Sequence, residues 1–139
     1  PLHLAVMYTA FSNSGSMITP YLIYKDDPSA EVWIDQAISK EHSSLLTEDL
    51  KAVVNNPAGS GYAAHRTDME LAGKTGTAEL KSEQGTTGQE IGWFSVFTTD
   101  PSASKPVLLT SMVESVEDKG GSTYVVKKDA AVLDSYFGS

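Results

Sequence analysis

The stretch Glu70-Leu-Ala-Gly-Lys-Thr-Gly-Thr-Ala-Glu-Leu80 decides the fold of this chain. Small residues in its middle surround one cation, Lys74, and two hydroxyls, Thr75 and Thr77. Glycine weakens a strand interior, so the two glycines of this run indicate that something lies close against its backbone. Side chains alternate along a strand, so Lys74 and Gly76 should share one face and the two threonines the other. At a sheet edge, such a strand offers N–H groups, hydroxyls and an ammonium to an anionic, peptide-like ligand.

Two apolar runs follow the key strand at short intervals. Residues 91–99 and 107–113 are rich in aromatic and aliphatic side chains, and a turn at 100–106 separates them. Connections this short exclude parallel crossovers, so the sequence predicts an antiparallel three-stranded meander with 91–99 at its centre. Residues 81–90 should form an exposed hairpin loop. Ser122 should cap a last helix, which ends near Phe137 and covers one face of the sheet.

The part before the key strand predicts two helices and a small β-hairpin. The helices are expected at 1–13 and from a Ser39 cap to about residue 55, and the hairpin pairs 20–25 with 31–34. Trp33 is expected to be packed, 58–64 to be a flexible loop, and His65 to lie on the surface. The apolar stripes assigned to the first, second and last helices are Leu4, Met7, Tyr8, Phe11; Leu46, Leu50, Val53, Val54; and Val126, Ala130, Leu133, Phe137. The fold class is therefore α+β, in one unit over 1–139.

The amino-acid composition argues against several classes of function. The chain has 139 residues, a net charge of −8 and 40% apolar residues, enough for a core. Lysine and arginine form no cluster, so nucleic-acid binding is not expected. The chain has no cysteine, and its three histidines make no metal-ligand pattern, so neither a metal nor a cofactor is expected. No apolar run reaches the length of about 18 residues that a membrane span needs.

The motifs resemble a known family. Gly73-Lys-Thr-Gly-Thr-Ala-Glu-Leu-Lys81 contains Lys-Thr-Gly, a signature of class A β-lactamases and penicillin-binding proteins. Asn13-Ser14-Gly15, Ile91-Gly-Trp-Phe94 and Val116-Glu-Asp-Lys-Gly120 extend the similarity. The chain resembles the C-terminal portion of the transpeptidase domain of a class B penicillin-binding protein, of the low-affinity, methicillin-resistance type. The resemblance implies that the meander belongs to a five-stranded sheet, that 1–139 is an incomplete domain, and that the parent protein is extracytoplasmic and membrane-anchored.

The resemblance also implies roles for four residues. Lys74 would attract the substrate carboxylate and hold the site hydroxyls, and Thr75 would hydrogen-bond the carboxylate of a D-Ala-D-Ala stem peptide or a β-lactam. Gly76 would keep the groove open. The N–H of Thr77 would be one of two oxyanion-hole donors. The other donor belongs to the catalytic serine, which the family carries upstream on a helix, in an S-x-x-K motif.

The chain has one literal S-x-x-K, Ser102-Ala-Ser-Lys105. It lies between Pro101 and Pro106, so no helix is expected there, and Ser102 is not expected to be a nucleophile. Alone, the chain should therefore be inactive. Strand 107–113 should be an exposed apolar edge that the N-terminal part of the domain, or a second copy, must cover.

The sequence is compatible with three functions. The first is a fragment of a D,D-transpeptidase. The second is a β-lactam sensor domain or a D,D-carboxypeptidase of the same fold. The third is a non-catalytic interaction module. An upstream S-x-x-K and S-x-N would separate the first two from the third.

Overall fold

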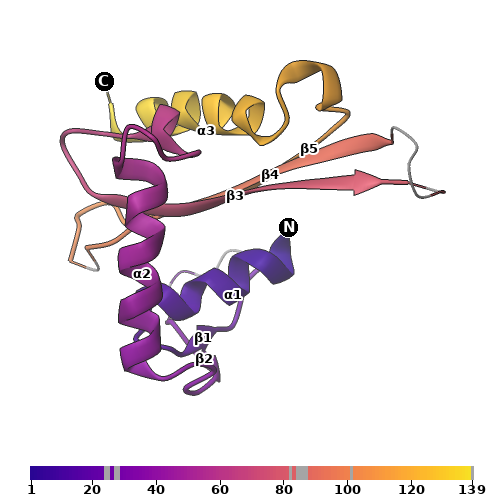
Figure 1. Cartoon of the computed structure of the whole chain (residues 1–139). Helices are drawn as coiled ribbons and strands as arrows, with labels where there is room; N and C mark the ends of the chain where they lie inside the picture. Colours follow the sequence, from indigo (N-terminus) through magenta and orange to yellow (C-terminus); the bar gives the residue numbers. More distant parts are fainter. Residues whose placement is uncertain (24–25, 27–28, 82, 84–87, 101, 139) are drawn as a thin grey trace.

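The computed structural model describes residues 1–23, 26, 29–81, 83, 88–100 and 102–138. Figure 1 shows a sheet with one helix above it, one below, and a third crossing one of its ends. The elements before the key strand are α1 (Leu2–Ser12), β1 (Met17–Ile18), β2 (Val32–Ile34), α2 (Lys40–Asn55) and the 3₁₀ turn η1 (Tyr62–Ala64). The others are β3 (Leu71–Leu80), β4 (Gln89–Thr98), β5 (Leu108–Glu114), the 3₁₀ turn η2 (Glu117–Lys119) and α3 (Ser122–Phe137).

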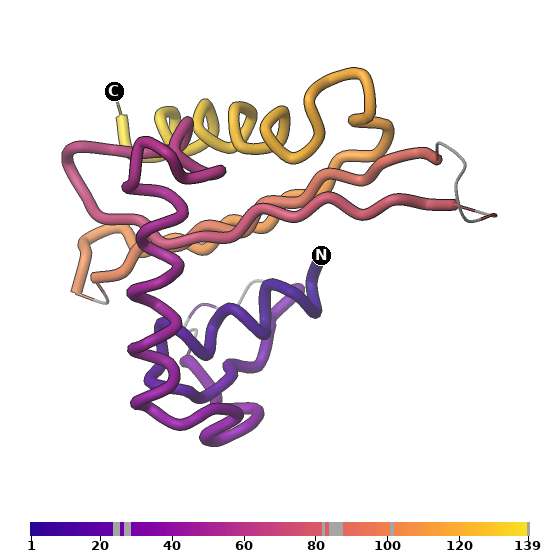
Figure 2. The backbone as a smooth tube through the Cα atoms, in the orientation of Figure 1, coloured from indigo at the N-terminus to yellow at the C-terminus, as the bar shows by residue number. Residues whose placement is uncertain are grey.

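The main sheet is the predicted meander. Its order is β3-β4-β5, every pair is antiparallel, and the register of β3 on β4 runs without a shift from Leu71 opposite Thr98 to Leu80 opposite Gln89. Phe94, Val96 and Phe97 on β4 are fully buried, which confirms β4 as the central strand. Figure 2 shows β3 and β4 side by side over their whole length, extending past the helices as a long arm.

The core lies between the sheet and α3. The buried side chains of this cluster are Val54, Ala64, Leu71, Phe94, Val96, Val125, Val126 and Leu133. The predicted stripe of the last helix is confirmed, because Val126 and Leu133 are buried and Ala130 and Phe137 pack beside them. A side chain such as Phe94 contributes about 1.5–3 kcal/mol on burial, so this layer holds β4 and β3 in place.

The caps of the two long helices differ. Ser39 caps α2 as predicted, since its side chain accepts the N–H of His42 at 3.2 Å. The prediction that Ser122 caps α3 is wrong. Gly121, at φ +60°, holds the cap position, and Ser122 is already the first helical residue. The α2 stripe is also partly wrong, because Leu46 is 41% exposed, and the buried residues of α2 are Ser43 near its start and Val54 near its end.

Helix α1 turns a different side inward from the one predicted. Val6 and Ala10 are buried, whereas Met7 is 43% exposed. Tyr8 and Phe11 do contact the sheet, through the ring of Phe97 at 6.2 and 6.0 Å. The helix is apolar on nearly all sides, so the sequence pattern alone could not select the buried face.

The small hairpin is shifted from its predicted position. Met17–Ile18 pairs with Val32–Ile34, and Pro20 and its neighbours up to Ile23 are not a strand; 24–25 and 27–28 lie outside the described residues. Pro20 has no N–H, so it ends the ladder. The prediction that Trp33 is packed is also wrong, because this residue is 54% exposed.

Asp129 on α3 is a buried carboxyl that sequence reasoning overlooked. Its residue is 3% exposed, and its Oδ1 accepts the hydroxyl of Ser111 on β5 at 2.7 Å. Burial raises the pKa of the Asp129 carboxyl above its usual range, and the Ser111 hydrogen bond offsets part of the rise. This hydrogen bond joins α3 to the edge strand β5.

The two glycines of the key strand are expected to respond differently to substitution. A Cβ at Gly73 would lie 2.6 Å from the carbonyl oxygen of Ser95 and 3.2 Å from both Phe94 and Val54, whereas at Gly76 its nearest neighbour, in Trp93, is 3.5 Å away. We expect Gly73→Ala to lower the free energy of unfolding by about 1–3 kcal/mol. Gly76→Ala should change it by less than about 0.5 kcal/mol. Urea unfolding followed by circular dichroism measures both, and equal losses would contradict the packing described.

Candidate functional site

The key strand is an edge of the sheet, as predicted. Strand β3 is hydrogen-bonded to β4 on one side, and no other strand of the described sheet pairs with it. Lys74 and Thr77 are exposed, and Thr75 and Gly76 are half-buried. The segment from Lys74 to Thr77 therefore presents its free edge to solvent.

The register shows which backbone groups point outward. The N–H of Thr98 donates to the Val107 carbonyl at 3.1 Å, so the backbone N–H and C=O of Thr98 point away from β3. Leu71 lies opposite Thr98 on β3, and its own N–H and C=O therefore point away from β4. The side-chain amide of Asn55 confirms this from outside, because it donates to the Leu71 carbonyl at 2.8 Å. Backbone direction alternates along a strand, so the N–H and C=O groups of Thr75 and Thr77 also point outward. They are the backbone groups that a ligand lying along β3 would meet.

Lys74 lies over this edge. Its Nζ donates to the outward carbonyl of Thr75 at 2.9 Å. In the part of the chain that the structure describes, the ion pairs of the other basic residues involve Lys51, Arg66 and Lys81, and none involves Lys74. An ammonium without a carboxylate partner beside outward N–H groups favours an anionic ligand.

The hydroxyls of Thr75 and Thr77 lie on the face that α3 covers. Thr75 Oγ1 is 2.7 Å from Ser60 Oγ, in the short segment between α2 and η1. Thr77 Oγ1 accepts the N–H of Ser122, the first residue of α3, at 3.3 Å. Both threonines are thus held from outside the strand. Sequence reasoning missed Ser60 and Ser122, because it treated the first as part of a loop and the second as a cap.

Gly121 allows α3 to approach the strand this closely. Its φ of +60° is unfavourable for residues with a Cβ, and an added Cβ would lie 3.3 Å from Thr77 Oγ1. At the other end of the helix, Arg66 Nη1 contacts Asp134 at 2.6 Å, and the guanidinium lies over the Phe137 ring at 5.2 Å. Helix α3 is therefore fixed at both ends.

Two other candidates are not part of this site. His65 stacks on Tyr62, and its Nδ1 lies 3.2 Å from Asn55 Oδ1; it is half-buried rather than on the surface as predicted. Ser102 lies in a turn as predicted, and both its N–H and its hydroxyl donate to Asp100. Lys105 donates to the Tyr136 carbonyl at 3.5 Å instead of contacting Ser102.

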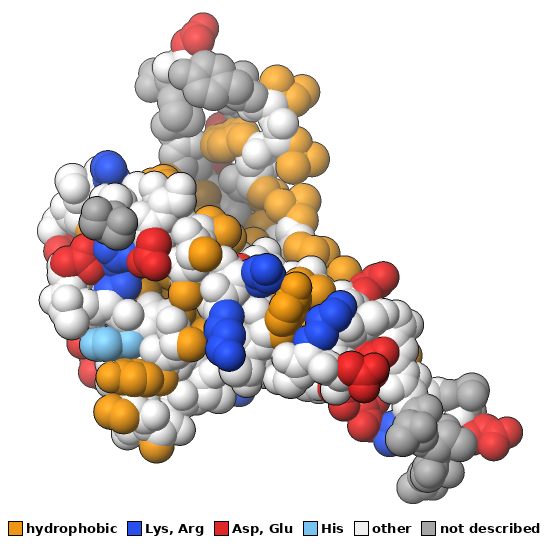
Figure 3. Space-filling view, turned by 90° about the horizontal axis from the view of Figure 1, so that it is seen from above, with side chains coloured by type: hydrophobic (Ala, Val, Ile, Leu, Met, Phe, Trp, Pro, Cys, Tyr) orange, Lys and Arg blue, Asp and Glu red, His pale blue; other side chains and the backbone are white. Residues whose placement is uncertain are grey.

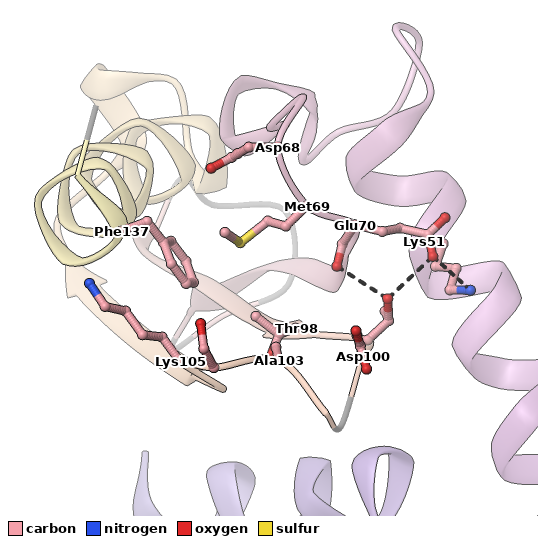
Figure 4. Close-up of a pocket in the computed structure, with 11 residues that line it drawn as sticks. Lys51, Asp68, Met69, Glu70, Thr98, Asp100, Ala103, Lys105 and Phe137 are labelled. Atoms are coloured by element: carbon pink, nitrogen blue, oxygen red, sulfur yellow. Dashed lines mark hydrogen bonds and ion pairs between the residues drawn. The ribbon is translucent and has the colours of Figure 1, made fainter.

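A hollow at the other end of β3 is separate from this edge. Figure 4 shows it between the start of β3, the β4–β5 connection and the end of α3. Two of its charged groups, Lys51 and Glu70, are paired with each other, because Lys51 Nζ contacts Glu70 at 2.9 Å, and Lys51 also contacts Glu48 at 2.8 Å. Lys74 and the threonines do not line it, so it is not a continuation of the edge.

Charge is unevenly spread over the face that carries α3. Figure 3 shows basic side chains across the middle of this face and acidic ones both toward the tip of the hairpin arm and at the opposite end. Lys119 and Lys128 both lie over the ring of Tyr124, at 5.5 and 5.2 Å. Among the described residues, no cluster of three or more His, Cys, Asp or Glu is arranged to hold a metal ion, and no helix is long and apolar enough to cross a membrane.

Comparisons with known proteins identify the family of the chain. The protein-family model described as the penicillin binding protein transpeptidase domain matches residues 1–133. The chain belongs to the penicillin-binding-protein transpeptidase family. Penicillin-binding protein 3 of Bacillus subtilis (strain 168) is 43% identical over 129 residues, which are 92% of this chain and 19% of that protein. The chain thus spans about a fifth of the length of this curated relative.

Solved structures share the fold. The apo transpeptidase domain of Burkholderia pseudomallei penicillin-binding protein 3 has a TM-score of 0.73 at 20% identity, over 95% of this transpeptidase chain and 40% of that one. The D,D-transpeptidase domain of a peptidoglycan glycosyltransferase from Eggerthella lenta has a TM-score of 0.66 at 26% identity, over 96% and 31%. The predicted family and fold class are confirmed.

The contact between Thr77 and Ser122 can be tested in this transpeptidase chain. Thr77→Val keeps the shape of the side chain but removes the acceptor, so we expect a loss of about 0.5–1 kcal/mol in unfolding free energy and faster hydrogen exchange of the Ser122 amide. Thr77→Ser keeps the oxygen and is the matched control. If both variants behave alike in urea unfolding and NMR exchange, the hydrogen bond does not hold α3 on the strand.

Proposed function

We propose that this chain is the part of a D,D-transpeptidase that grips the acyl donor in cell-wall cross-linking. The observation that carries the proposal is the open edge from Lys74 to Thr77, with outward N–H groups and an ammonium that has no carboxylate partner among the described residues. Acyl transfer needs donors for the developing oxyanion and a fixed substrate, and an edge strand supplies both.

The four site residues have distinct roles in this proposal. Lys74 attracts the carboxylate of a peptidoglycan stem peptide ending in D-Ala-D-Ala, or of a β-lactam, and Thr75 hydrogen-bonds it. Gly76 leaves the groove open, in line with the free space around its Cα. The outward N–H of Thr77 donates to the oxyanion. The donor ester or amide is attacked by a serine outside this chain.

The proposal also places the other catalytic groups outside this chain. The nucleophile and its lysine come from the remaining part of the transpeptidase domain, in a parent protein outside the cytoplasm and anchored to the membrane. Low affinity for β-lactams, as in methicillin-resistance proteins, stays a prediction from sequence similarity. A sensor domain or a D,D-carboxypeptidase would use the same edge, and product analysis with and without an acceptor amine separates transfer from hydrolysis.

Labelling by a fluorescent penicillin tests the proposal. The isolated chain should show no covalent labelling, because Ser102 is held in a turn by Asp100. A chimera that carries this chain in place of the aligned 129 residues of Bacillus subtilis penicillin-binding protein 3 should be labelled. Lys74→Gln in the chimera should slow labelling by roughly tenfold or more, since a charge-assisted contact to the carboxylate is lost.

Unfolding of the chimera is the control for misfolding. A folded chimera that penicillin does not label, beside a labelled Bacillus subtilis parent, would contradict the proposed function. A labelled band from the isolated chain that disappears on Ser102→Ala would contradict the role given to the missing serine.

We also propose that the other edge of the sheet, β5, pairs with a further strand. The occupant is the remaining part of the domain or, in the isolated chain, a second copy through residues 107–113. Strand β5 is bonded to β4 alone among the described strands, and Leu108, Leu109, Met112 and Val113 are half-buried without full cover. Open apolar edges of this kind favour strand addition.

Sedimentation of the isolated chain tests this edge. Val107 is hydrogen-bonded to β4, and backbone direction alternates along β5, so the N–H of Met112 points away from β4. Met112→Pro removes this outward N–H, and should therefore keep the β4–β5 ladder while blocking addition of a strand. We expect wild type to associate with rising concentration and Met112→Pro to stay monomeric. A wild-type chain that remains monomeric at millimolar concentration would count against pairing at β5.

A further inference from the structure

Ser60 is held rigidly although it lies in a segment rich in small residues. It stands between Gly59, which has no room for a side chain, and Gly61, which is tightly packed. A Cβ at Gly59 would lie 2.2 Å from the Val53 carbonyl oxygen, and one at Gly61 would lie 3.2 Å from both Phe94 and that oxygen. The two glycines therefore lie flush against the end of α2 and the core. The predicted flexible loop at 58–64 is instead a tight turn that ends in η1.

The turn does not need the Ser60 hydroxyl. Its backbone bonds are made by main-chain groups, with the Gly59 N–H donating to Asn56 at 2.7 Å and the Gly61 N–H to Val53 at 3.0 Å. The Ser60 hydroxyl points instead to the edge of the sheet, where its Oγ lies 2.7 Å from Thr75 Oγ1. Ser60 is exposed and Thr75 is half-buried, so a ligand at this edge can reach both.

We propose that Ser60 is a second hydroxyl donor for the carboxylate of the acyl donor, acting together with Thr75. This inference rests on the proposed function. Each hydroxyl carries one proton, and in the free chain one of the two is used in the bond between them. A carboxylate has two acceptor oxygens, so on binding both protons turn to it and the bond between the hydroxyls is exchanged for two charge-assisted ones.

The same position gives Ser60 a positioning role. Thr75 lies directly opposite Phe94 in the register, and Phe94 is the side chain against which Gly61 packs. The turn and the strand thus rest on one buried ring, which fixes the distance between the two hydroxyls. Nucleophilic chemistry is not assigned to Ser60, because the one hydrogen-bond partner that the described residues give it is Thr75, which is no base.

The test compares a carboxylate with its ester in the chimera described above. Benzylpenicillin carries the carboxylate and benzylpenicillin methyl ester does not, and the acylation rate for each is read from the loss of later fluorescent labelling. We expect Ser60→Ala to slow acylation by benzylpenicillin roughly tenfold, the loss typical of one hydrogen bond to a charged group. It should slow the ester less than twofold, and Ser60→Thr should restore most of the rate.

Controls separate the possible failures. Ser44→Ala changes an exposed serine on α2 far from β3 in sequence and should leave both rates unchanged. Equal slowing of both probes by Ser60→Ala, or no slowing of either, would overturn the role of Ser60 while leaving a labelled wild-type chimera and the proposed function intact. A folded wild-type chimera that neither probe acylates would remove the proposed function and this inference with it.

Discussion

The site depends on one constraint, which is that β3 pairs with β4 alone among the strands that the structure describes. The backbone N–H and C=O groups of successive residues on a strand point to alternate sides. Once the direction at one residue of β3 is known, the direction at every other residue follows. The bond from Thr98 to Val107 sets this direction, and it places the N–H groups of Thr75 and Thr77 on the open side. Ammonium, hydroxyls and amides meet there because they share one strand.

The strand is kept open and straight by what packs beside it. Gly73 lets the strand lie against Val54 and Phe94. Ser60, in the segment between α2 and η1, and Ser122, the first residue of α3, contact the threonine hydroxyls. Helix α3 is fixed at its far end by Arg66, which contacts Asp134 at 2.6 Å and lies over the Phe137 ring. The edge is therefore already formed in the free chain, which would reduce the cost of binding for the ligand proposed here.

Much of this could be predicted from the sequence. Apolar runs with short connections identify the meander and its centre, and the glycine-rich run with Lys74 identifies the edge. The sequence could not select the inward face of α1, because that helix is apolar on all sides, nor place the hairpin strand before Pro20. Ser60 escaped notice because serine among glycines is typical of a loop, and only the packing of Gly59 and Gly61 makes it rigid. Asp129 was missed because a carboxyl on a helix is usually solvated.

Amide hydrogen exchange along β3, followed residue by residue by NMR, tests the open edge most directly. The outward N–H groups of Gly73, Thr75 and Thr77 should exchange fast, and those of Ala72, Lys74, Gly76 and Ala78, which face β4, should be protected. Gly73 is buried, so Thr75 and Thr77 give the clearest contrast with Lys74 and Gly76. Uniform protection from residue 72 to residue 78 would mean that the strand is bonded on both sides, and would contradict the account.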